Sequence, residues 1–264
     1  MIKDITIGQY YPSNSVLHKV DPRVKLIGTI GYIVSLFLVS NPIGYIIAGI
    51  FLATMIYISK VPFKFITKGL KAVVMLLAFT IIFNLFTPGT PVVELGFIVI
   101  SREGIETAFF MSIRLIFLIL GSSLMTFTTT PNYLTDGLES LLKPLNKIKV
   151  PVHEISMMMS IALRFIPILM EETDKIMKAQ TARGADFETG GLVKRAKGLV
   201  PILVPLFVSA FRRANDLAMA MEARCYRGGD GRTKMKPLKY KSLDMISYII
   251  LVVYVIILLL MNRI

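Results

Sequence analysis

The sequence has very few of the side chains that bind metals or form disulfide bonds. Its 264 residues include one cysteine, Cys225, and two histidines, His18 and His153. A single cysteine excludes an intrachain disulfide, and these three residues are too few for a zinc site of the usual His and Cys ligands. We therefore expect neither a metal site nor a bound cofactor.

Sequence signatures of catalysis are missing as well. No Gly-x-x-x-x-Gly-Lys-Ser/Thr occurs, so this sequence has no phosphate-binding loop of that kind. His153-Glu154 is followed by Met157, where the helix of a zinc metalloprotease has its second histidine. No paired acid and base and no activated nucleophile stands out. The sequence predicts a non-catalytic protein, without catalytic residues.

Acidic residues are few and apolar residues are many. The chain has 17 Asp and Glu against 30 Lys and Arg, a formal net charge of +13. Hydrophobic residues make up 54% of it, more than the ~45–50% that is usual in soluble proteins. They gather in uncharged runs, which is typical of segments whose solvent is the bilayer. This distribution predicts an integral membrane protein rather than a soluble nucleic-acid binder.

The uncharged runs predict about five transmembrane helices. Lys and Arg are dense in the N-terminal arm, at 60–71 and throughout 131–243, whereas the turn at 41–42 and the loop at 88–104 are roughly neutral. Because cytoplasmic segments carry the excess of Lys and Arg, we expect a multi-pass protein of the cell membrane with the N-terminus inside and the C-terminus outside. The runs are 26–40, 42–58, 72–87, 105–129 and 245–261.

The segment 131–243 has apolar residues at helical spacing among many charges. Thr130 precedes Pro131, the usual order of an N-cap and a first helical residue, and later prolines predict kinks. The uncharged stretch 198–211 is shorter than the ~20 residues of a span and has cations at both ends. We predict three long, kinked amphipathic helices under the membrane or along its interface. The whole is then an all-α membrane protein with a four-span membrane domain at 1–130, a cytoplasmic coupling domain at 131–243 and a C-terminal span at 244–264.

Two short motifs stand near the predicted ends of two of these helices. Arg183 and Arg224 each follow an alanine there, and an arginine at a helix end can present its five donors to a partner. The alternative is a cation that favours the helix dipole or belongs to a positive cytoplasmic face. The motifs are Ala182, Arg183 and Gly184, and Ala223, Arg224 and Cys225.

With these motifs the sequence resembles the transmembrane T component of energy-coupling factor transporters, of the type in which one module serves several binding subunits. The layout agrees over nearly the whole chain, and the likeness is most specific over 179–236. The second motif departs mildly, since Cys225 stands where the first has Gly184. The likeness is carried by ARGADF at 182–187, PLFVSAFRRA at 205–214 and AMEARCYRGG at 220–229, with DPRVKL at 21–26 before the first span.

The resemblance implies a scaffold that joins two ABC-type ATPases to a small substrate-binding membrane protein, the S subunit, for uptake of vitamins or other micronutrients. It implies that the two arginine motifs end coupling helices and dock into the two ATPases. The expected partners are these subunits and the lipid bilayer, with no nucleic acid. The choice of substrate is left to the S subunit.

Other functions compete with this reading. An ordinary ABC importer permease would share the faint coupling-loop pattern of Glu222, Ala223 and Gly228, but we find no polar path through the spans. A membrane-anchored binder of nucleic acid or anionic lipid would use the basic segment 131–243 and would bind in a salt-dependent way. Acidic residues interleaved in that segment argue against it. A secondary transporter would need a midplane site and repeated halves, and neither is evident.

Overall fold

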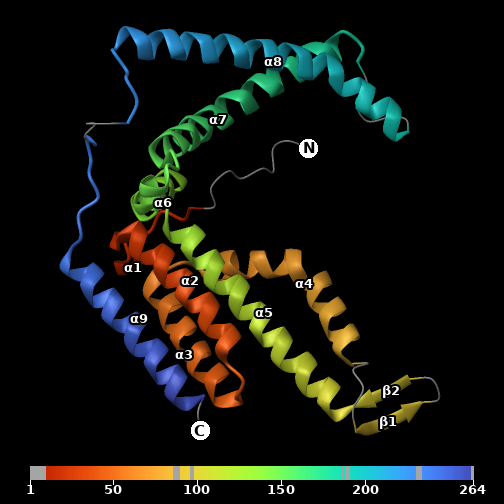
Figure 1. Cartoon of the computed structure of the whole chain (residues 1–264). Helices are drawn as coiled ribbons and strands as arrows, with labels where there is room; N and C mark the ends of the chain where they lie inside the picture. The colour runs from red at the N-terminus through yellow and green to blue at the C-terminus, as the bar shows by residue number, and fades with distance from the viewer. Residues whose placement is uncertain are drawn as a thin grey trace. The chain divides into compact units, whose positions relative to one another are not determined.

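The computed structural model describes residues 10–85, 90–95, 98–185, 187, 191–229 and 234–262. The described chain is helical except for one small hairpin of strands (Figure 1). It forms two compact units, which we call the membrane unit and the coupling unit. The membrane unit contains the described residues from 10 to 141 and from 238 to 262, and the coupling unit those from 142 to 237.

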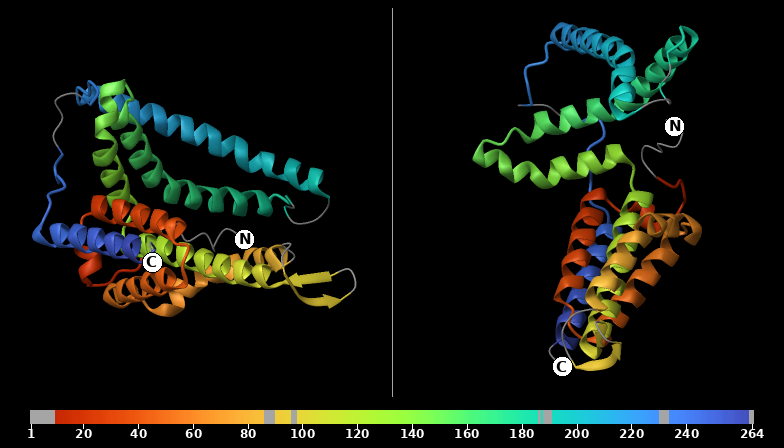
Figure 2. Two further views of the ribbon diagram at one scale, coloured as in Figure 1. Left: turned by 60° about the horizontal axis from the view of Figure 1, so that its bottom comes forward. Right: turned by 90° about the vertical axis from the view of Figure 1, so that its right-hand side faces the viewer.

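The membrane unit is a bundle around the long helix α5. Helix α5 packs against α2, α3 and α4, and α9 packs against α2 and α3, so the last helix joins the first ones (Figure 2). The core between them includes Tyr32, Leu36, Ala48, Leu52 and Leu258. The elements are α1 (Val16–Lys19), α2 (Pro22–Leu38), α3 (Pro42–Ser59), α4 (Phe63–Leu85), β1 (Pro91–Leu95), β2 (Ile98–Ser101), α5 (Arg102–Thr128), α6 (Pro131–Leu142) and α9 (Ser242–Met261), with β1 and β2 antiparallel.

Local sequence explains where these helices begin and end. Asp21 caps α2 by accepting the backbone N–H of Arg23, and Pro22 occupies the first helical position. Pro42 begins α3 in the same way, and Lys60 ends it in the left-handed conformation, with φ 54°. The turn at 41–42 and the helix start after Thr130 are therefore as predicted.

The outer surface of the membrane unit is apolar, as a bilayer solvent requires. Phe37, Ile46 and Phe83 are each more than 60% exposed, and a soluble monomer rarely exposes apolar side chains in large patches. Within the described residues, α3, α5, α7 and α9 are long and apolar enough to span a membrane. Helix α2, with 17 residues, and the apolar part of α4, Val73–Leu85, are shorter. The prediction of an all-α membrane protein is confirmed.

The structure differs from the sequence-based expectation in three places. The basic stretch at 60–71 is mostly helix, because α4 begins at Phe63 and lysines are good helix formers. The 88–104 loop contains the strand hairpin. The first amphipathic helix, α6, is short rather than long: it ends at Leu142, because Pro144 cannot donate to the preceding turn and the chain continues as the 3₁₀ helix η2 (Lys143–Ile148).

The coupling unit consists of η2 and two long helices, α7 (Val152–Ala182) and α8 (Leu192–Ala223). They have 31 and 32 residues, and they pack against each other (Figure 1). Pro167 lies inside α7, and Pro201 and Pro205 lie inside α8, where the missing N–H groups account for the bends. Both lie within 131–243, where long, kinked amphipathic helices were predicted.

Candidate functional site

The two predicted arginines occupy the same place on α7 and α8. Arg183 and Arg224 are the C-cap residues, with φ/ψ of −88°/6° and −94°/14°. The prediction that each ends a long helix is confirmed. Both side chains are exposed, as are the four flanking residues of the two motifs. Among the described residues neither guanidinium has an ion pair or side-chain hydrogen bond, so both are available to a partner.

The backbone closes both helices with one hydrogen-bond pattern. The N–H of Gly184 donates to Thr181 O at 2.9 Å, and that of Ala185 donates to Gln180 O at 3.0 Å. At the other end, the N–H groups of Cys225 and Tyr226 donate to Glu222 O and Met221 O at the same 2.9 and 3.0 Å. This pair of bonds is the Schellman motif, which satisfies carbonyls that a helix end leaves unpaired. Each arginine is thus held one residue before a sharp reversal of the chain.

Cys225, which stands in the second motif where the first has Gly184, has a conformational cost. Gly184 has φ +87° and Cys225 has φ 56°, so both lie in the left-handed region that favours glycine. We expect Cys225→Gly to leave the helix end intact and to be neutral or slightly stabilising, because relief of strain offsets the greater freedom of the unfolded chain. Gly184→Ala is expected to destabilise the chain by about 1 kcal/mol. Thermal unfolding of the two variants in detergent measures both effects, and equal losses of Tm would contradict the assignment.

Arg224 also lines a recess between α8 and the first half of α7. The recess has a volume of about 620 Å³, and none of the described residues that line it is a carboxylate. Arg164 and Arg227 join Arg224 in its wall, so the three cations would favour an acidic group of a partner. Neither Arg164 nor Arg227 was predicted from the sequence as a site residue. The signal available for Arg164 was its position inside the otherwise uncharged stretch 155–170.

Close packing brings the end of α8 back to the beginning of α7. A Cβ atom at Gly229 would lie 2.5 Å from Cδ2 of His153, so only glycine fits there without a shift. Farther along, Arg213 Nη2 of α8 lies 2.9 Å from Glu172 Oε2 of α7. The two contacts join the long helices at separate points.

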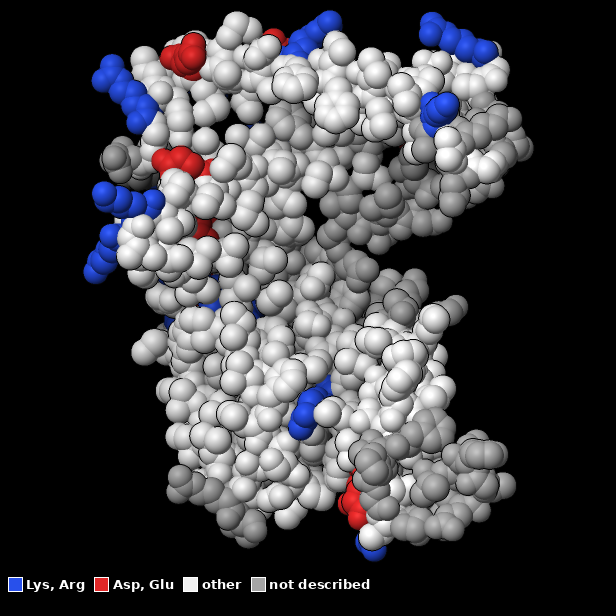
Figure 3. Space-filling model, turned by 45° about the vertical axis from the view of Figure 1, so that its right-hand side comes forward, with Lys and Arg blue, Asp and Glu red and all other residues white. Residues whose placement is uncertain are grey.

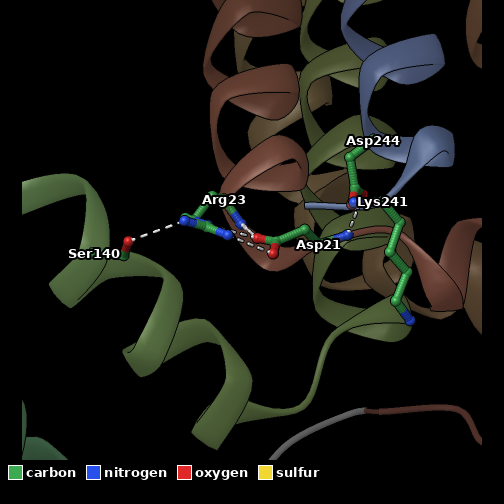
Figure 4. A network of polar contacts seen from close by, with 5 residues as sticks. All are labelled: Asp21, Arg23, Ser140, Lys241 and Asp244. Atoms are coloured by element: carbon green, nitrogen blue, oxygen red, sulfur yellow. Dashed lines mark hydrogen bonds and ion pairs between the residues drawn. The ribbon is translucent and has the colours of Figure 1, made fainter. Parts of the chain in front are cut away.

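A polar cluster in the membrane unit joins the starts of α2 and α9 (Figure 4). Asp244, in the first turn of α9, is 1% exposed. Its Oδ1 accepts the N–H of Asp21 at 2.8 Å, and its Oδ2 accepts the N–H of Lys241 at 2.7 Å. One carboxylate therefore caps the starts of both α2 and α9. Asp244 was not predicted as a site residue, because its only signal in the sequence is that of a lone acid at the start of the last apolar run.

Arg23 extends this cluster to α6. Its guanidinium contacts both carboxylate oxygens of Asp21 at 2.9 Å and donates to Ser140 Oγ at 3.3 Å. The guanidinium also lies 3.8 Å from the centre of the Tyr240 ring. Burial raises the pKa of Asp21, but the hydrogen bonds and the positive charge of Arg23 lower it by more. The pKa of this carboxyl is therefore below its usual value. The Asp21–Arg23 pair stays charged at neutral pH and anchors α6 to the start of α2.

The chain is similar to transport proteins over nearly its whole length. Residues 13–235 match the family CbiQ, described as cobalt transport protein. The energy-coupling factor transporter transmembrane protein EcfT of Clostridium kluyveri is 59% identical, over 94% of this chain and 93% of that protein. Proteins of the same name are 54% identical in Ruminiclostridium cellulolyticum, over 96% of both chains, and 48% identical in Bacillus subtilis, over 92% of this chain and 93% of that one.

Proposed function

This chain belongs to the CbiQ family of cobalt transport proteins, and we propose that it is the transmembrane T subunit of an energy-coupling factor transporter. It would join two separate ABC-type ATPases to a small S subunit that binds the substrate, a vitamin or another micronutrient. The observation that carries the proposal is the matched pair of helix ends, which present Arg183 and Arg224 in the same conformation. Two helix ends of the same conformation suit two ATPase subunits of similar structure.

The coupling mechanism follows from this pairing. Two ATPase subunits close on each other and open again during their cycle, so a membrane partner must contact both to respond to the motion. An exposed arginine can make several charge-assisted hydrogen bonds in a polar groove. Closure of the ATPases would then move α7 against α8, as rigid helices that slide or rotate at their contacts. The Arg213–Glu172 pair joins the two helices that would move.

The chain itself is proposed to be non-catalytic. The names of its relatives describe transmembrane transporter components, and the sequence has no phosphate-binding loop of the Walker type. An ordinary importer permease is the weaker alternative, because two arginine-ended helices and the lack of a polar path favour the T subunit.

Assembly tests the proposal directly. Coexpressed with the two ABC-type ATPases of the same organism, the chain should co-purify with both, and ATP hydrolysis should require the ATPases. The chain purified alone should hydrolyse no ATP. Steady hydrolysis by a preparation shown to be free of other subunits, or repeated failure to retain either ATPase, would contradict the assignment.

The coupling unit is proposed to lie on the cytoplasmic side, although α7 satisfies the length and composition of a span. On a Cys225→Ser background, cysteines at Gly191 and Met235 should resist an impermeant thiol reagent added to intact cells; Met235 is 97% exposed. Ser40→Cys, at the exposed turn between α2 and α3, is the matched site that should be labelled from outside. Labelling of Gly191→Cys from outside would show that α7 or α8 crosses the membrane.

A further inference from the structure

A second recess lies in the membrane unit at the end opposite the Asp244 cluster. Helix α2 ends there at Leu38, α3 begins there at Pro42, and Asn262, which follows α9, donates to Leu38 O at 2.8 Å. The recess has a volume of about 380 Å³. Residues that line it include Val39, Ser40, Tyr45, Glu106, Phe110 and Arg114.

Arg114, on the apolar helix α5, is only partly satisfied within this recess. Its Nη2 donates to Val39 O at 3.1 Å, and its Nη1 has only a weak contact with Met111 Sδ at 3.8 Å. Its Nε is buried and has no hydrogen-bond partner. Among the described residues no carboxylate pairs with this guanidinium. A cation on a membrane helix without a counter-ion is costly, so an anion from outside the chain would stabilise it.

The carboxylates nearest in the recess are engaged elsewhere. Glu106 pairs with Arg102 at 3.3 Å, and Glu103 accepts the backbone N–H of Thr90 at 2.8 Å. The Val39 carbonyl, at the negative end of the α2 dipole, accepts a hydrogen bond from one of the five N–H groups of Arg114. It leaves Nη1, whose only contact is the weak one with Met111 Sδ, able to donate to an anion such as a phosphate.

The surroundings of the recess indicate where such a phosphate would come from. Phe37 and Met111 line the recess and are 61% and 41% exposed, and Phe109 on the same helix turn is 60% exposed. On the face shown in Figure 3, the membrane unit carries few charges amid uncharged surface. An apolar rim beside a cation at the end of a helical bundle suits a lipid, whose acyl chains cover the rim while its headgroup reaches the cation.

We propose that this recess binds the phosphate of a membrane phospholipid through Arg114. The site is independent of the ATPase contacts, because it lies in the membrane unit and shares no residue with the two arginine motifs. Tyr45 and Phe37 flank the guanidinium, with ring centres 5.8 and 5.7 Å from its Cζ, and hold it in place for the headgroup.

Binding of phosphatidylglycerol to the purified, delipidated chain, measured by native mass spectrometry, tests the proposal. Arg114→Gln should weaken retention of the lipid about tenfold, as expected for loss of one charge-assisted contact, and Arg114→Lys should weaken it less. Glu106→Gln should strengthen it, because a negative charge leaves the recess wall. Lys64→Gln, an exposed cation of the same unit outside the recess, is the matched control and should change nothing.

Two outcomes would overturn the proposal. In the first, Arg114→Gln would retain the lipid as well as the unaltered chain does and yet unfold at a lower temperature without lipid. In that case Arg114 would serve only to cap α2. If inorganic phosphate displaced phosphatidylglycerol at equal concentration, the site would belong to a soluble anion instead. Loss of lipid in Arg114→Gln with unchanged unfolding in lipid-free detergent, and no competition by inorganic phosphate, is the expected result.

Discussion

Reversing both helix-end arginines, as Arg183→Glu with Arg224→Glu, is expected to abolish uptake and to release the ATPases while the chain still inserts in the membrane. Each arginine is exposed and unpaired in the described chain, so its loss costs little in the isolated subunit. In a complex, removing a buried hydrogen-bonded charge contact costs about 2–5 kcal/mol, much of it from partner groups left unpaired. Reversal adds repulsion if the groove is acidic.

The measurement is co-purification of the ATPases together with uptake by cells or vesicles. Lys175→Glu with Lys197→Glu is the matched control, because it makes the same change of charge on the same two helices at exposed positions away from their C-terminal ends. The single reversals should each weaken one of the two contacts. Equal damage from the control pair would show that a diffuse basic surface, rather than two specific contacts, holds the ATPases.

Asp244→Ala is expected to cause the largest loss of stability in the membrane unit. The change leaves the buried backbone N–H of Asp21 and the part-buried N–H of Lys241 without their acceptor. An unsatisfied buried donor costs about 1–3 kcal/mol and the part-buried N–H of Lys241 at most as much, so the total cost is about 1–6 kcal/mol. Asp244→Asn keeps the shape and one acceptor, and should lie between Asp244→Ala and the unaltered chain.

Thermal unfolding of the purified chain in detergent measures this effect. Lys241→Ala is the control, since it removes an exposed side chain but keeps the N–H that Asp244 accepts. We also expect Asp244→Ala to lower uptake, because α2 and α9 would no longer be joined at the end where Arg23 holds α6. An unfolding temperature equal to that of the control would contradict the role of Asp244 as a shared cap.

Much of the architecture was predictable because its causes are local. Uncharged runs indicate a bilayer wherever they lie in a fold, and Pro22, Pro42 and Pro131 mark helix starts through their own fixed φ. Gly184 marks a helix end for a similar reason, since a left-handed residue after the last turn favours glycine. Cys225 gave no such signal, yet it adopts the same conformation because the backbone hydrogen bonds of its helix end require it.

The polar clusters, in contrast, depend on residues that only folding brings together. Asp244 and Asp21 stand 223 residues apart, and nothing near either residue indicates the other. Arg114 and Val39, or Arg164 and Arg224, meet because whole helices pack in one register. Hydrophobic burial is roughly proportional to area and has no direction, so a pattern of apolar residues predicts that helices pack but not which polar atoms come within 3 Å. Those distances are set by the packed side chains of the folded chain.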